Sequence, residues 1–172
     1  MKSGPGYTWI DLGWGALVNK LTRLHNVEVQ AGVVGSDAGK QHPGDHGTEV
    51  TIAEVALINE FGSGDGHVPE RSFMRDVTRR PNAVGQFGTV SATASRRIIQ
   101  GASVEAGLAV LGNWAVAKIQ ENILSNVPPP QAEATVEKKG HSHTLIDTDT
   151  LFDSISFEIV SKAGSDDGFD GE

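Results

Sequence analysis

The sequence predicts an α+β fold in which a small antiparallel sheet packs with several helices. Alternating apolar residues indicate two strands, one over residues 27–35 and one over residues 155–159. Between them, apolar residues recur mostly at helical spacing, and the longest such run predicts a long helix near 103–126. No internal repeat is visible, and 172 residues suit one domain, which we place at residues 1–160.

A helix followed by a strand opens the predicted domain. From Ile10 to Leu24, apolar residues recur every three or four positions, as on one face of an amphipathic helix. Asp11 is the predicted N-cap of this helix, and the Gly4–Gly6 stretch before it is predicted to be loop. The strand that follows alternates apolar and polar residues from Val27, which predicts that one of its faces is buried.

The next segment combines flexible loops with a short helix. Residues 36–49 contain four Gly or Pro residues, which predicts an exposed loop. The short helix is predicted to begin after Thr51 as N-cap and to end at Gly62. A second flexible loop is predicted at 62–67, and one or two helical turns at 70–80.

Two longer helices and a closing strand complete the predicted fold. Helical spacing extends over residues 83–99, and Ser103 is the predicted N-cap of the long helix. Gly107 and Gly112 weaken that helix, which predicts close packing of its backbone against a neighbour. Residues 131–143 are predicted to be a flexible loop with a short strand near Thr135–Lys138, before the closing strand.

Composition and charge exclude several classes of protein. With no cysteine, the chain has no disulfide, thiolate nucleophile or Cys-based zinc site. A net charge of −8 does not suit a nucleic-acid binder, and no apolar run approaches the ~20 residues of a membrane span. Residues 161–172 carry one Lys and four acids, Asp166, Asp167, Asp170 and Glu172, a net of −3 that predicts a disordered tail.

The sequence offers ingredients of a metal site but no recognisable catalytic motif. His141 and His143, followed by Asp147, Asp149 and Asp153, have the residue types of an N/O metal site. The H-S-H pattern loosely resembles that of JAMM-type metallopeptidases, but the Pro, Ser and Asp that such a motif needs are missing. Neither H-E-x-x-H nor G-x-S-x-G occurs. We therefore expect no enzyme, cofactor or metal, and keep a metal-dependent hydrolase as an alternative.

Three segments together carry the specific signal in this sequence. They read V-A-L-I-N-E-F-G at 55–62, V-P-E-R-S-F-M-R at 68–75, and L-I-D-T-D-T-L-F-D-S-I-S-F-E at 145–158. Their order and spacing resemble the tail-completion (neck) family of long-tailed bacteriophages, also labelled virion-morphogenesis or minor tail protein. The matching motif residues, which are also the candidate subunit-interface residues, are Asn59, Glu60, Phe61, Gly62, Pro69, Arg71, Phe73, Arg75, Asp147, Thr148, Leu151 and Ser154.

The chain departs from the family pattern at two positions. Ser72 stands where the family usually has Pro, which loosens the entry to the next helix. Asp149 stands where the family usually has Gly, and Asp tolerates a positive φ, so a tight turn at residues 148–150 is still expected.

The residues around the 62–67 loop allow two interpretations. Ile58, Phe61 and Phe73 are predicted apolar anchors at its ends, and Glu60 and Arg71 are predicted to pair across it. In one interpretation, residues 59–62 only end a helix that packs on the core. In the other, the loop together with Arg71 and Arg75 meets a neighbouring subunit, because arginine binds carboxylates through two parallel hydrogen bonds.

The resemblance implies a structural virion protein of the neck or tail top, which completes the tail and joins head to tail as a ring. It implies as partners other copies of the chain, as a hexamer, the tail terminator or tail tube protein, and the head-closure or connector proteins near the portal. It implies assembly in the host bacterial cytoplasm, proximity to DNA in the channel and no membrane. A tail terminator of the same junction and a host-side binding module are two competing interpretations of the sequence.

Overall fold

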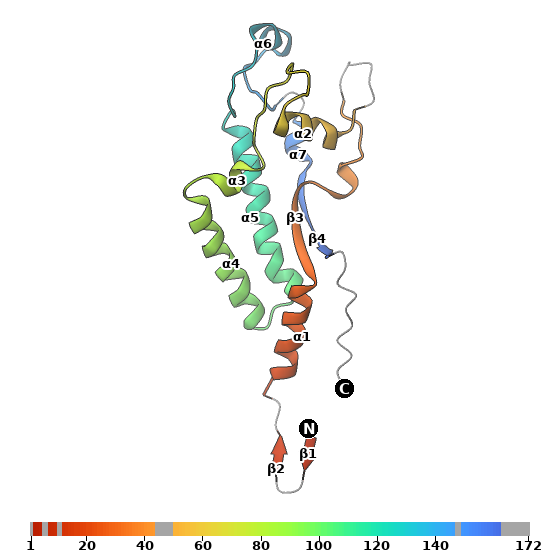
Figure 1. Cartoon of the computed structure of the whole chain (residues 1–172), viewed down its shortest axis with the longest axis vertical. Coiled ribbons are helices and arrows are strands. Elements are labelled where there is room, and N and C mark those ends of the chain that lie inside the picture. Colours follow the sequence, from red (N-terminus) through yellow and green to blue (C-terminus); the bar gives the residue numbers. More distant parts are fainter. Residues whose placement is uncertain (1, 5–6, 10–11, 44–49, 147–148, 163–172) are drawn as a thin grey trace.

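The structure, a computed structural model, describes residues 2–4, 7–9, 12–43, 50–146 and 149–162 of an elongated molecule (Figure 1). Its elements in chain order are β1 (Lys2–Gly4), β2 (Tyr7–Trp9), α1 (Trp14–His25), β3 (Val27–Val33), the short 3-10 helix η1 (Gly35–Asp37), α2 (Ile52–Phe61), α3 (Asp76–Arg79), α4 (Ala83–Ile99), α5 (Val104–Leu124), α6 (Glu133–Lys139), α7 (Thr150–Asp153) and β4 (Ile155–Ser161).

A two-stranded antiparallel sheet and two long helices form the body of the molecule. β3 pairs with β4 from Val27 opposite Ser161 to Val33 opposite Ile155. Both strands and the α+β class predicted from the sequence are confirmed. Figure 1 shows α5 between α4 and the sheet, and α5 contacts both strands as well as α4. The long helix is confirmed too, with Ser103 as its N-cap, accepting a hydrogen bond from the Ala106 N–H.

The glycines of α5 allow its backbone to pack closely on both sides, as predicted. A Cβ atom added at Gly112 would overlap the ring of Phe157 on β4. A Cβ atom added at Gly107 would overlap the side chain of Ile98 on α4. The missing side chains therefore set the distance between α5 and its two neighbours.

We expect Gly112→Ala to destabilise the fold, although alanine favours helix. Overpacking a core costs about 1–3 kcal/mol, which exceeds the ~1 kcal/mol that alanine contributes over glycine in a helix. Gly85→Ala in α4 is the matched control, because an added Cβ there has no neighbour within 4 Å. Thermal unfolding should show a lower melting temperature for Gly112→Ala and an equal or higher one for Gly85→Ala. A stabilised Gly112→Ala would show that the sheet does not pack tightly on α5.

The N-terminal part of the chain differs from the prediction. α1 begins at Trp14 rather than Ile10, and its N-cap is Gly13 in a left-handed conformation; Asp11, the predicted N-cap, lies outside the described residues. Gly4, predicted to be in a loop, belongs to β1, which pairs with β2 in a hairpin that the sequence did not predict. The short strands give too few residues for their alternation to be recognised.

The helix around residues 52–61 is confirmed at both ends. Thr51 is the N-cap of α2 and forms a capping box with Glu54, in which each side chain accepts a hydrogen bond from the other residue's backbone N–H. The helix ends before Gly62, whose φ of 78° favours glycine. The helix predicted at 83–99 is confirmed as α4, and the single turn of α3 confirms the helical turn predicted within the 70–80 stretch.

Two further elements correct the predicted loops. Residues 131–143, predicted to be irregular with a short strand, contain α6 instead. Glu133 in its first turn and Lys138 and Lys139 in its last turn suit the helix dipole, and Gly140 ends the helix in a left-handed conformation. The single turn of α7 before β4 was not predicted. Ser161, assigned to the tail, is the last residue of β4, and the tail from residue 163 lies outside the described residues.

The larger part of the core lies at the end of the molecule where α2, α3, α5 and α7 meet. Its buried side chains are Ile52, Ala56, Phe73, Val77, Ile119, Ile123, Val127, Leu145, Leu151 and Ile155. A smaller cluster at the other end contains Val27, Ile98, Val104 and Leu108. Within the described ranges, no helix is both long enough and apolar enough to cross a bilayer.

Candidate functional site around Glu60 and Arg71

Glu60, near the end of α2, is a buried carboxylate surrounded by hydrogen-bond donors. Its residue surface is 1% exposed. One carboxylate oxygen accepts from the Ser72 hydroxyl at 3.1 Å, the Arg75 N–H at 3.0 Å and the Arg75 Nε at 2.7 Å. The other accepts from the Met74 N–H at 2.9 Å. The segment from Ser72 to Arg75 therefore wraps around a single side chain of α2.

The charge of Glu60 is stabilised in spite of its burial. Burial is the largest single influence on its pKa and acts to raise it. The hydrogen bonds from Met74, Arg75 and Ser72 together outweigh burial, so the pKa of Glu60 lies below its ordinary value. The carboxylate is thus ionised at neutral pH and forms a salt bridge with Arg75.

Arg75 connects Glu60 to the surface. Besides the carboxylate of Glu60, its guanidinium donates to the backbone carbonyl of the same residue and to Glu70, both at 2.7 Å. The hydrogen bond to Glu60 is the main reason that the pKa of Arg75 is raised. The guanidinium also lies over the ring of Phe61, 4.3 Å from its centroid, a cation–π arrangement. Arg75 thereby fixes the position of Phe61 at the end of α2.

The predicted pairing of Glu60 with Arg71 is wrong. Arg71 is 6% exposed and donates from Nε to the backbone carbonyl of Pro129 at 3.0 Å. Its backbone N–H donates to the Asn59 carbonyl at 2.7 Å, and its side chain binds Pro129 rather than the Glu60 carboxylate. Burial without a carboxylate lowers the pKa of Arg71 from its ordinary value. Both arginines have the positive charge needed to pair with Glu60. The turn formed by residues 72–75 places only Arg75 beside the Glu60 carboxylate.

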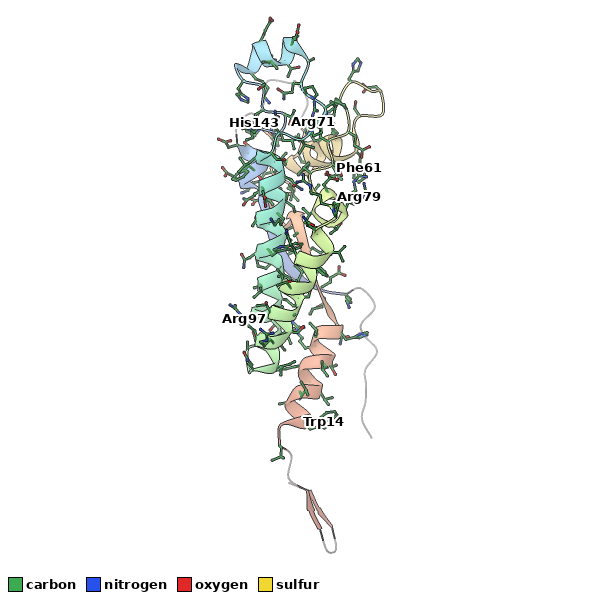
Figure 2. The ribbon with its side chains drawn as sticks, turned by 90° about the vertical axis from the view of Figure 1, so that its left-hand side faces the viewer. Trp14, Phe61, Arg71, Arg79, Arg97 and His143 are labelled. Atoms are coloured by element: carbon green, nitrogen blue, oxygen red, sulfur yellow. The ribbon has the colours of Figure 1, made fainter. Side chains whose placement is uncertain are left out.

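Arg71 lines a groove of about 700 Å³ between α2 and the chain that follows α5. Its walls are mostly apolar and include Val55, Ile58, Val68, Pro69, Pro129 and Pro130. Asn59, Gln131 and Thr144 add polar groups to the lining, and the Gln131 Oε1 is buried without a hydrogen-bond partner. Figure 2 shows Arg71 toward the α6 end of the molecule, far from Trp14 on α1.

The loop between α2 and this segment closes tightly on itself. The Ser63 N–H donates to the Val68 carbonyl at 2.8 Å, and the Val68 N–H donates to the Ser63 hydroxyl at 2.7 Å. A Cβ atom at Gly62 would lie 3.0 Å from the Val68 carbonyl oxygen and 3.1 Å from the Glu70 nitrogen. Together with the positive φ of Gly62, this close approach explains why glycine follows Phe61.

The apolar anchors predicted at the loop behave differently from one another. Phe73 is 0% exposed and lies in the core, and its backbone carbonyl accepts a hydrogen bond from Asn122 of α5 at 2.9 Å. Phe61 is 56% exposed, and Ile58 is also partly exposed. Leu57, on the same helix, is 53% exposed. Of the three predicted apolar anchors, only Phe73 is buried, whereas Ile58 and Phe61 contribute to an apolar surface of α2.

The third motif segment, residues 145–158, packs in the core, and its described residues do not line the groove. Leu151 is buried in the same cluster as Phe73, and buried Ser154 donates to the Thr150 carbonyl at 2.5 Å. Asp149 has a φ of 56°, the left-handed conformation expected where the family has glycine. Asp147 and Thr148 lie outside the described residues.

The structure therefore brings together the first two motif segments in one hydrogen-bonded unit. It also adds groups that the sequence did not single out, namely Glu70, Met74, Asn122, Pro129 and the hydroxyl of Ser72. Backbone groups such as the Met74 N–H leave no signal in a sequence. Ser72 was one signal in the sequence for this network. Its hydroxyl supplies a hydrogen-bond donor, which the proline usual at this position of the motif would lack.

The candidate metal ligands of residues 141–153 do not form a metal site in the part of the chain that is described. His141 and His143 are half-buried between α6 and α7, and no group of three or more His, Asp or Glu side chains there could hold a metal ion. Asp147, one of the predicted ligands, lies outside the described residues.

Comparison of the chain with protein-family models, curated proteins and solved structures finds no match. The resemblance carried by the three motif segments therefore stays a prediction.

Proposed function

We propose that this chain is a structural protein of a bacteriophage virion, which assembles into a ring at the neck or tail top and joins head to tail. It acts without enzymatic chemistry. Its partners are further copies of itself, the tail terminator or tail tube protein, and the head-closure or connector proteins near the portal. The motif resemblance suggests this role, and the geometry of the α2 surface supports it.

The supporting observation is an apolar surface held in place by a buried ionic network. Leu57, Ile58 and Phe61 lie exposed on α2, which we call the α2 face. Directly beneath it, Glu60 receives four hydrogen bonds from residues 72–75. Large apolar side chains on a pre-organised surface are typical of protein interfaces, because little conformational entropy is lost when such a surface is covered.

The proposed interface is heterologous, so that the α2 face of one copy contacts a different surface of the next. Such contacts close into a ring when a whole number of rotations from one copy to the next makes a full turn. If the ring lines a DNA channel, we expect the lining to be acidic or neutral, because a basic lining would hold the phosphates.

We expect Leu57→Asp to weaken self-association while leaving the fold intact. A charge in the covered centre of an interface must be desolvated without a partner, which costs several kcal/mol. Val84→Asp is the matched control, because Val84 is 73% exposed on α4, away from the α2 face. Light scattering over a concentration series should show a multimeric wild type and Val84→Asp, and a largely monomeric Leu57→Asp. Equal masses for all three would contradict the role of the α2 face.

A further inference from the structure

Arg71 is a buried cation for which the described part of the chain supplies no carboxylate. It is 6% exposed, and its side chain donates to the neutral carbonyl of Pro129. Glu60 and Glu70 both bind Arg75 instead. A buried charge is costly unless it is paired, so Arg71 suits a site that an external anion completes.

The groove around Arg71 restricts what that anion can be. Its walls are apolar, formed in part by Ile58, Pro69 and Pro130. The buried Gln131 Oε1 in its lining is a hydrogen-bond acceptor without a donor. Apolar walls, a guanidinium and a free acceptor together fit a peptide segment that offers a carboxylate, an apolar side chain and backbone N–H groups.

One segment of this chain has that chemistry. Residues 163–172 read A-G-S-D-D-G-F-D-G-E, with four acids, no basic residue and a single aromatic, Phe169. The segment begins just after Lys162, whose backbone N–H donates to the Asn26 carbonyl at the end of α1. That point lies at the other end of the sheet from α2, α7 and the groove (Figure 1).

We propose that residues 163–172 of one copy bind in the Arg71 groove of the next copy. Phe169 contacts the apolar walls, and a carboxylate of Asp167 or Asp170 pairs with the Arg71 guanidinium. This inference rests on the proposed function, because it names the segment that joins neighbouring copies in the ring. Since the segment begins at the end of the sheet away from the groove, each contact joins two different surfaces of neighbouring copies, as a ring requires.

A second copy fits the groove better than the same chain does. Phe169 is the seventh residue after Lys162, a reach of about 25 Å when fully extended. β4 carries the chain about 20 Å away from the α7 end, near the groove, before the segment begins. To bind the groove of its own chain, the segment would have to reverse direction and run back along the sheet, which would use about 20 Å of its ~25 Å reach.

Cysteine cross-linking tests the proposal directly, because the chain has no native cysteine. Full-length Ile58→Cys is mixed with full-length Gly168→Cys, which keeps Phe169 and both candidate acids, under mild oxidation, and disulfide-linked dimers are followed with time. The control mixture is Val84→Cys with Gly168→Cys. We expect the Ile58–Gly168 dimer to form at least tenfold faster than the control. Equal rates would overturn the proposal, and so would exclusive cross-linking within one chain when a single chain carries both Ile58→Cys and Gly168→Cys.

Arg71 is tested in the Ile58→Cys background. Arg71→Met should lower the cross-linking rate toward that of the control, whereas Arg71→Lys should retain part of it, since the charge remains. The melting temperature of Arg71→Met should be unchanged or higher, because an unpaired buried charge is removed. An unchanged cross-linking rate in Arg71→Met would overturn the assigned role of Arg71.

The mass of the wild-type chain separates the two proposals. A multimeric chain with no selective Ile58–Gly168 cross-link would overturn the groove proposal and leave ring assembly standing. A chain that stays monomeric at every concentration would overturn both.

Discussion

Replacing Glu60 with glutamine is expected to lower the free energy of unfolding by about 2–4 kcal/mol. The glutamine amide has the same shape, but one carboxylate oxygen becomes an NH2 group that faces N–H donors. Two of those donors are backbone groups, of Met74 and Arg75, and cannot turn away. Arg75 also loses its buried counter-charge and keeps only the more exposed Glu70.

The matched control is Glu137→Gln on α6, because Glu137 is exposed. Urea unfolding at neutral pH should shift strongly for Glu60→Gln and hardly at all for Glu137→Gln. Similar curves for the two variants would show that the carboxylate of Glu60 does not organise the 72–75 segment.

The Glu60 effect should also depend on pH, in a direction fixed by its pKa. The folded-state pKa lies below the ordinary value, so ionised Glu60 stabilises the fold above the unfolded-state pKa of about 4.3. That contribution is lost as the pH falls through the folded-state pKa. The difference in stability between wild type and Glu60→Gln should therefore be constant near neutral pH and shrink below about pH 4. A difference that stays constant into acid would contradict the assigned charge state.

Replacing Phe73 with alanine is expected to destabilise the fold by about 3–5 kcal/mol. The side chain is 0% exposed and lies among the buried residues of α2, α5 and α7, so its removal leaves a cavity that these elements cannot easily fill. A loss of this size is a large part of the total stability of a typical domain. Chemical unfolding followed by circular dichroism measures the change.

Phe73→Leu and Phe61→Ala calibrate that result. Leucine fills most of the space, so Phe73→Leu should cost clearly less than Phe73→Ala. Phe61 is 56% exposed and contacts Arg75 through its ring, so Phe61→Ala should cost at most about 1 kcal/mol. Equal losses at positions 61 and 73 would contradict the assignment of Phe73 to the core and Phe61 to the surface.

The elements with strong local signals could be predicted from the sequence. Thr51 and Ser103 are N-caps because their hydroxyls accept from backbone N–H groups three residues on. Gly112 is costly within a long helix, and that cost indicated close packing against a neighbour, which the structure identifies as Phe157. Both strands of the main sheet followed from their alternation alone.

The elements that were missed depend on contacts or on very short segments. α7 is a single turn, and β1 and β2 have three residues each, too few to show a period. The polar stretch that forms α6 has no apolar face to mark it as a helix. Its acidic first turn, its basic last turn and Gly140 after them are nevertheless typical of a helix. The three prolines before this stretch favoured the prediction of a loop instead.

The candidate site, too, could be predicted from the sequence only in part. Its residues were identified through their motif, but their roles were not. Glu60 has two arginines within reach along the chain, and the choice between them depends on a turn that directs backbone N–H groups at the carboxylate. Whether Phe61 or Phe73 is buried depends on which side of that turn faces α5. Both are properties of the folded backbone and cannot be read from residue types.

The central claim is that the α2 face lies at a heterologous interface of a ring. Electron microscopy of the assembled wild-type protein tests it most directly, because it shows both the symmetry and the position of α2. We predict closed rings in which Leu57 and Phe61 of each copy are covered by a different surface of the next. Two-fold dimers, or rings in which α2 faces solvent, would contradict the claim.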